Sequence, residues 1–123
     1  MTTVLILDND PGFLFWLGTL LGESGYQSLP ALNVVEALSL TQQFKVKIDL
    51  LIVDPLQTGV ADFINSLRLS QGRVKVLAAS DQQGIDLPVL NASIRKPDQF
   101  DENTLMGWIS TVERLLAKEK LVD

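Results

Sequence analysis

Short apolar runs recur along the chain and predict buried strands. Four consecutive aliphatic residues lie within 3–7, and the run 49–53 is nearly as continuous. Neither run alternates between apolar and polar positions, as a strand with one solvent-exposed face would. Weaker runs at 26–29, 74–79 and 92–95 bring the number of predicted strands to five.

Apolar residues at helical spacing lie between these strands. The first predicted helix extends from Pro11 to about Ser24, with Asp10 as its N-cap and Gly25 as the residue that ends it. The apolar stripe of this helix would cover a sheet and consists of Phe13, Leu14, Leu17, Leu20 and Leu21.

Two neighbouring aromatic residues, Phe15 and Trp16, lie outside that stripe. One interpretation places them at the edge of the core, which is the more usual position for aromatic residues in an apolar helix. The other is an exposed patch that docks a partner or a second copy of the chain.

Three further helices follow along the chain. The second begins at a capping box formed by Asn33 and Glu36 and continues to Leu40. The third spans 61–69, and the last, 101–118, has the most regular pattern. Their inner residues are Phe63, Ile64 and Leu67 in the third and Leu105, Trp108, Ile109, Val112, Leu115 and Leu116 in the last.

By contrast, glycine and proline between 80 and 91 predict an irregular segment with a short helix at most.

The alternation of strands with helices predicts an α/β fold. Parallel strands need crossover connections, so the expected architecture is a doubly wound parallel sheet with helices on both faces. In such sheets the functional crevice lies outside the carboxyl ends of the strands. Four predicted strands end there in Asp8, Asp54, Ser80 and Lys96.

Length and charge limit what such a site can do. The 123 residues suit one domain, 1–123, and 46% hydrophobic against 20% charged residues is the profile of an ordinary globular protein. The formal net charge of −5 disfavours a nucleic-acid surface, which needs clustered cations. We therefore expect no direct contact with nucleic acid.

Cysteine and histidine are both absent from the chain. Disulfides, thiolate nucleophiles, histidine general bases and the common zinc sites are thereby excluded, and any metal must be bound through oxygen. The sequence also lacks a cleavable apolar leader and any run of about 18 apolar residues that could span a bilayer. A cytoplasmic protein without membrane contact is expected.

Two acids and one lysine at strand ends suit phosphorylation of a carboxylate. A hard divalent ion with oxygen ligands can neutralise the incoming phosphoryl oxygens, and a lysine adds a second positive charge. A hydroxyl and backbone N–H groups would complete the cradle. No general base is needed, because the accepting aspartate is already ionised. A lone acid after a strand is usually a turn or capping residue. Three charged residues, Asp8, Asp54 and Lys96, at the ends of three predicted strands favour a site instead.

The order and spacing of these residues resemble the receiver domain of bacterial two-component response regulators. The resemblance covers essentially the whole chain and implies a flavodoxin-like sheet of order 2-1-3-4-5. It makes Asp54 the phospho-acceptor, Lys96, which precedes Pro97, the phosphoryl contact, and Ala78 the position of a missing Ser or Thr. The implied Mg²⁺ ligands are Asp8, Asn9, Asp54 and the backbone carbonyl of Leu56.

The resemblance also implies partners. A receiver domain accepts its phosphoryl group from a histidine kinase or a phosphotransfer protein, acts on an output domain or a downstream protein, and in some cases forms homodimers. A receiver domain is a signalling module rather than an enzyme.

Several positions depart from the receiver pattern. Asn9 replaces an acid, which predicts a weakened Mg²⁺ site. Ala78 lacks the hydroxyl, and Ser80 could replace it only if the register shifted by two residues. Ser93 stands where the family usually has a mobile aromatic residue, and Thr58 stands where it has a proline. Lys96 lies 18 positions after Ala78, fewer than the family usually has, which predicts a shortened or irregular helix between the fourth and fifth strands, the fourth helix of the receiver fold. These departures leave two modes of action open: phosphorylation of Asp54, or protein contacts that do not depend on phosphorylation.

Two other classes of function are compatible with parts of the sequence. The run Asp8-Asn9-Asp10 resembles the catalytic motif of haloacid-dehalogenase-type phosphatases, although Gly12 departs from it. A phosphatase would use Asp8 and Asp10. The third class, a flavin binder, lacks a hydroxyl-rich phosphate loop after the first strand.

Overall fold

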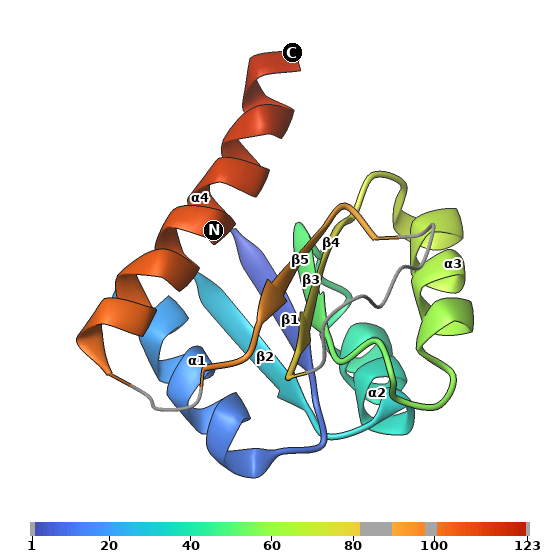
Figure 1. The fold of residues 1–123 in the computed structure, drawn as a ribbon. Coiled ribbons are helices and arrows are strands. Elements are labelled where there is room, and N and C mark those ends of the chain that lie inside the picture. The colour runs from blue at the N-terminus through green and yellow to red at the C-terminus, as the bar shows by residue number, and fades with distance from the viewer. Residues whose placement is uncertain (1, 82–89, 98–100, 123) are drawn as a thin grey trace.

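The computed structural model describes residues 2–81, 90–97 and 101–122. Its strands form one parallel sheet in the order β2-β1-β3-β4-β5 (Figure 1), which confirms the predicted fold class. The strands are β1 (Thr3–Leu7), β2 (Gln27–Ala31), β3 (Leu50–Val53), β4 (Lys75–Ser80) and β5 (Ala92–Arg95).

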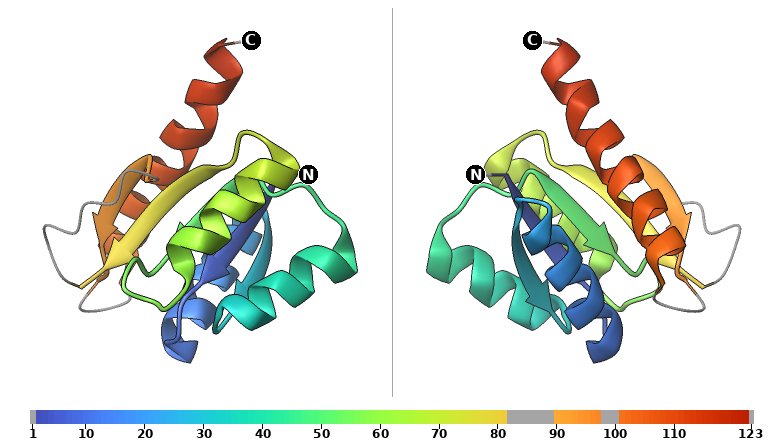
Figure 2. Two further views of the ribbon diagram at one scale, coloured as in Figure 1. Left: turned by 90° about the vertical axis from the view of Figure 1, so that its right-hand side faces the viewer. Right: turned by 90° about the vertical axis from the view of Figure 1, so that its left-hand side faces the viewer.

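Helices cover both faces of the sheet. They are α1 (Pro11–Glu23), α2 (Val34–Phe44), α3 (Val60–Gln71) and α4 (Glu102–Val122). The helices α1 and α4 lie together on one face and α2 and α3 on the other (Figures 1 and 2). None of these helices combines the length and the apolar character needed to cross a membrane, as far as the described residues extend.

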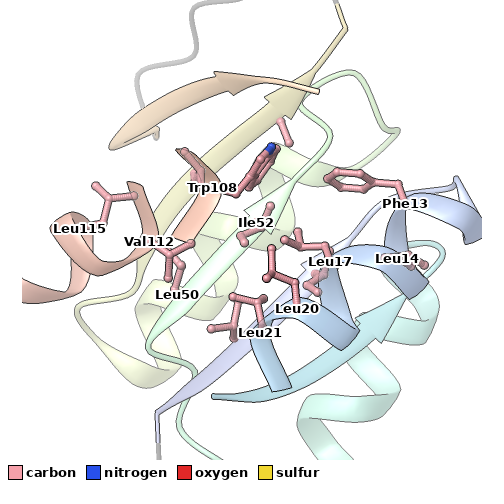
Figure 3. Close-up of a cluster of buried hydrophobic side chains, with 14 residues drawn as sticks. Phe13, Leu14, Leu17, Leu20, Leu21, Leu50, Ile52, Trp108, Val112 and Leu115 are labelled. Atoms are coloured by element: carbon pink, nitrogen blue, oxygen red, sulfur yellow. The ribbon is translucent and has the colours of Figure 1, made fainter. Parts of the chain in front are cut away.

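The core consists of two layers, one on each face of the sheet. The layer under α1 and α4, which we call the site layer, holds Val4, Ile6, Phe13, Leu14, Leu17, Leu20, Leu21, Leu50, Ile52, Leu77, Ala79, Trp108, Val112 and Leu115 (Figure 3). The layer under α2 and α3, the distal layer, holds Leu5, Leu7, Leu29, Ala31, Ala37, Ile48, Leu51, Val53, Val60, Phe63, Ile64, Leu67, Val74 and Val76. Successive residues of the strands alternate between the two layers, as the geometry of a strand requires.

The strand β2 lies slightly later in the sequence than predicted. The prediction ended it at Leu29, before Pro30, but the strand continues through Pro30 to Ala31. The N–H of Gln27 and the C=O of Ala31 bond to the β1 side, so alternation directs the nitrogen of Pro30 to the open edge. A proline is tolerated there because no ladder bond is lost.

Side-chain caps begin α1 and α2 as predicted. Asp10 Oδ1 accepts hydrogen bonds from the N–H groups of Gly12 (3.0 Å) and Phe13 (3.4 Å). Asn33 Oδ1 accepts from the Glu36 N–H at 2.8 Å, and the Glu36 carboxylate accepts from the N–H preceding the cap residue. The second helix runs one turn beyond its predicted end.

The C-terminal third has the predicted strand and helix, but α4 ends at Val122, four residues beyond its predicted end. The strand β5 has the predicted bounds, and α4 begins one residue after Asp101, whose carboxylate caps it through Thr104. The turns of α4 near the C-terminus extend past the sheet in all three views (Figures 1 and 2). The irregular segment predicted between β4 and β5, with a short helix at most, falls largely on 82–89, which lie outside the described residues.

The two aromatic residues beside the α1 stripe have different environments. Phe15 is 78% exposed, whereas Trp16 is half-buried and packs against the site layer. The core-edge interpretation therefore holds for Trp16 and not for Phe15.

Candidate functional site

The carboxyl ends of β1, β3 and β5 bring Asp8, Asp54 and Lys96 to one edge of the sheet. Leu7 pairs with Val53, so Asp8 and Asp54 follow at the same level of adjacent strands. The Asp54 N–H donates to the carbonyl of Leu7 at 3.0 Å. On the far side of β4, the Lys96 N–H donates to the Ser80 carbonyl at 2.9 Å.

Asp8 and Lys96 form a buried ion pair. The Asp8 side chain is 1% exposed and that of Lys96 17%, and Lys96 Nζ lies 2.7 Å from Asp8 Oδ2. The other carboxylate oxygen, Oδ1, accepts a hydrogen bond from the Asp10 N–H at 2.9 Å. Both oxygens of Asp8 are therefore engaged by groups that favour its charged form.

Burial nevertheless raises the pKa of Asp8 above its ordinary value. The loss of hydration is the largest cause, and the negative charge of Asp54 acts in the same direction. The Lys96 ammonium and the Asp10 N–H act against it without cancelling it. The carboxylates of Asp8 and Asp54 thus interact electrostatically, as expected of two acids that share a site.

Asp54 is the more accessible of the two acids. Its side chain is half-buried, and Oδ1 accepts a hydrogen bond from the Leu56 N–H at 3.0 Å. Pro55 behind it is buried, and Leu56 is exposed. This geometry presents the carboxylate at the surface of the sheet edge.

The other predicted positions lie around this centre. Asn9 and Asp10 are both exposed, and Asp10 is occupied with capping α1. Thr58 and Ser93 are exposed as well, on the loop after β3 and on β5. No hydrogen bond or ion pair joins any of these four described residues to Asp54.

The end of β4 offers no hydroxyl at the level of Asp54. Val53 pairs with Ala78, so the register continued by one residue places Ala79 beside Asp54. Ala79 belongs to the site layer, and alternation puts Ala78 on the opposite face. The prediction assigned the missing hydroxyl to Ala78, whereas the register puts Ala79, also without a hydroxyl, at this level. Ser80, the alternative, is buried and lies one position further along β4.

Solved structures of receiver domains match nearly the whole chain. CheY4 of Vibrio cholerae has a TM-score of 0.75 and 24% identity, with 94% of this chain and 99% of that one covered. A response regulator of Thermotoga maritima has a TM-score of 0.76 and 22% identity over 95% and 98% of the two chains. TrrA of the same organism, solved with Mg²⁺ and BeF, has a TM-score of 0.71 and 25% identity over 94% and 100%.

This chain has the receiver fold. No protein-family model and no curated protein sequence matches it, so the likeness rests on the structure. The receiver fold places its strand-end residues where the sequence pattern predicted them, at the carboxyl edge of the sheet.

The acids of this receiver fold meet the minimal requirement for Mg²⁺. Mg²⁺ retains several waters and takes one or two carboxylates from the protein, and Asp8 and Asp54 supply two at one level. No group of three acidic residues that could hold a metal occurs among the described residues, and Asn9, beside Asp8, carries no charge. The donor set therefore fits a weak site rather than a tight one.

An aromatic cluster beneath Lys96 was not predicted as part of the site. Lys96 Nζ lies 4.7 Å from the centroid of the Phe13 ring. The Phe13 ring in turn lies 5.6 Å from that of Trp108 and 6.2 Å from that of Trp16. Figure 3 shows Phe13 on α1 and Trp108 on α4 in the same layer of the core. The helical spacing revealed both residues as core, but only the fold shows that the lysine lies over one of them.

Proposed function

We propose that this chain is a receiver-type signalling module that accepts a phosphoryl group on Asp54. The observation that carries the proposal is the arrangement at the sheet edge. A half-exposed carboxylate, Asp54, lies at the level of the buried pair of Asp8 and Lys96. The likeness of the fold to receiver domains over nearly the whole chain supports the same conclusion.

The transfer itself needs little from the protein beyond position and charge. An oxygen of the Asp54 carboxylate forms the new bond to phosphorus, while the bond from phosphorus to the donor breaks and its electron pair leaves with the donor. The carboxylate is ionised at neutral pH, so no general base takes part. The Lys96 ammonium lies on the same edge and supplies positive charge to the phosphoryl oxygens.

Asp8 and Asp54 would hold Mg²⁺, with Asn9 and the Leu56 carbonyl as the further ligands that the sequence predicts. When bound, Mg²⁺ supplies the charge that neutralises the phosphoryl oxygens. The amide of Asn9 carries no charge, so binding is weaker than at a site with three acids. A divalent ion would also relieve the repulsion between Asp8 and Asp54.

The donor is a phosphohistidine of a histidine kinase or of a phosphotransfer protein, and the output is contact with a downstream domain or protein. Ala79 of β4, which lies beside Asp54, offers no hydroxyl contact to the phosphoryl group. Loss of one such donor typically lowers a rate by about 10²–10³-fold. We therefore expect phosphorylation of Asp54 to be slow.

The phosphatase alternative has less support. It requires Asp8 as an accessible nucleophile and Asp10 as an acid and base. Asp8 is 1% exposed and paired with Lys96, and the Asp10 carboxylate accepts the hydrogen bonds that begin α1.

Exposure to acetyl phosphate with Mg²⁺, followed by intact mass measurement, tests the proposal. The expected result is one added phosphoryl group, absent without Mg²⁺ and absent in Asp54→Asn. Asp62→Asn, a neutralised exposed acid on α3, is the matched control and should behave as the wild type. No added mass under any condition would overturn the phosphoryl acceptor and leave a module that acts by protein contact alone.

A further inference from the structure

Lys96 links the proposed phosphoryl site to α1 and, through α1, to α4. Its ammonium contacts Asp8 at 2.7 Å and also lies over the Phe13 ring at 4.7 Å. A cation over the face of an aromatic ring is attracted by the negative charge of that face. Lys96 is therefore held on one side by an acid of the site and on the other by a residue of α1.

Phe13 belongs to a cluster that connects two helices. Its ring meets Trp108 of α4 edge to face, at an interplanar angle of 62°. Trp16 of α1 meets Trp108 at 87° with centroids 6.2 Å apart. Edge-to-face contacts depend on ring orientation, so a small rotation of one ring disturbs its neighbours. Phe13, Trp16 and Trp108 form what we call the aromatic cluster.

We infer that Lys96 transmits the state of Asp54 to the aromatic cluster, with Phe13 as the residue that positions the lysine. A phosphoryl group on Asp54 carries more negative charge than the Asp8 carboxylate, so the ammonium moves toward it and away from the Phe13 ring. The cluster then repacks between α1 and α4. This inference rests on the proposed phosphorylation of Asp54.

The residues around Asp54 favour this route. Ala79 carries no hydroxyl that could follow the phosphoryl group, and Ser93 on β5 is a small exposed residue. Lys96 places its charged group against a core layer that spans two helices. The output surface is accordingly the pair of α1 and α4.

Tryptophan emission reports on the aromatic cluster directly, because Trp16 and Trp108 are the two tryptophans of the chain. The protein is first equilibrated with Mg²⁺, and acetyl phosphate is then added while emission and intact mass are followed in parallel. The expected result is an emission change with the same half-time as the gain of the phosphoryl group. Asp54→Asn should show neither.

Two variants separate the positioning role from general packing. In Phe13→Leu the phosphoryl group is still gained, but the emission change falls at least twofold because the lysine no longer lies on a ring. Phe63→Leu makes the same change in the distal layer, at a residue that is 4% exposed, and should keep the full emission change. If Phe13→Leu does not fold, Phe13→pentafluorophenylalanine keeps the ring shape and removes its negative face.

The failures of the two proposals are distinguishable. Phosphorylation without an emission change, or equal losses in the Phe13 and Phe63 variants, would overturn the inference and leave Asp54 as the acceptor. No phosphorylation at all would overturn the proposed function and with it this inference.

Discussion

The two core layers are equal in size and different in kind. Among the described residues, each contains 14 buried residues, most of them from strands and two helices. The site layer holds Phe13 and Trp108, and the Phe13 ring lies under the Lys96 ammonium. The distal layer is mainly aliphatic and meets the site acids through backbone hydrogen bonds, from the Asp54 N–H to Leu7 and from the Asp8 N–H to Ala31. Both layers stabilise the fold, but the site layer also holds an aromatic ring against the charged side chain of Lys96.

The largest expected effect is a loss of folding stability, and this loss should be similar in the two core layers. Trp108→Ala and Phe63→Ala each remove a buried aromatic side chain, and each should lower the free energy of unfolding by about 3–5 kcal/mol. Urea unfolding followed by circular dichroism measures both. A loss of about 1 kcal/mol or less in either variant would show that its layer is not a packed core.

The next largest loss of folding stability should follow from breaking the ion pair of Asp8 and Lys96. Lys96→Met leaves the buried Asp8 carboxylate without its ammonium and should lower the free energy of unfolding by about 2 kcal/mol at neutral pH, below the range for fully buried pairs because water reaches the lysine. Combining it with Asp8→Asn should restore most of the loss. Lys75→Met, a half-buried lysine at the other end of β4, is the control. Equal losses in Lys96→Met and Lys75→Met would contradict a specific pair.

A smaller effect should depend on pH. Because burial raises the pKa of Asp8 in the folded state, its contribution to stability is complete below the unfolded pKa of about 3.9 and is lost as pH rises through the folded pKa. Asp8→Asn should therefore be more stable than the wild type at pH 7, and the difference should shrink toward pH 4. A difference that grows on acidification would reverse the sign and refute the burial argument.

The smallest effect compares the caps of one helix from each layer. Asp10→Ala on α1 and Asn33→Ala on α2 each remove a side-chain cap and should cost about 1 kcal/mol. Phosphoryl uptake should be unchanged in both, because each side chain caps its helix and neither has a hydrogen bond to Asp54. Loss of uptake in Asp10→Ala alone would give Asp10 a chemical role and favour the phosphatase alternative.

Most of the fold could be predicted from the sequence. Continuous apolar runs marked the strands, Asp10 and Asn33 marked two helix starts, and the helical stripes gave the inner faces of α1, α3 and α4. The end of β2 could not be predicted, because Pro30 reads as a strand terminator until the edge position of the strand is known. The local sequence pattern predicts that a strand forms. Whether that strand tolerates a proline depends on its position in the sheet, which the pattern does not give.

Less of the site was visible in the sequence. Their positions at strand ends predicted that Asp8, Asp54 and Lys96 lie at one edge of the sheet. The strand register of the structure places them there. The partner of Lys96 was not predictable, because an ammonium on a long side chain can reach either acid, and the structure pairs it with Asp8. The ring of Phe13 beneath it depends on how α1 packs on the sheet, which no local motif records.

The most direct test of the central claim is to locate the phosphoryl group. Borohydride reduces an aspartyl phosphate to homoserine, and peptide mass spectrometry after treatment with acetyl phosphate and Mg²⁺ then identifies the residue. The account predicts homoserine at position 54 and aspartate at positions 8 and 10. Homoserine at position 8 would contradict it and indicate a phosphatase-type nucleophile, and aspartate at all three positions would show that Asp54 accepts no phosphoryl group.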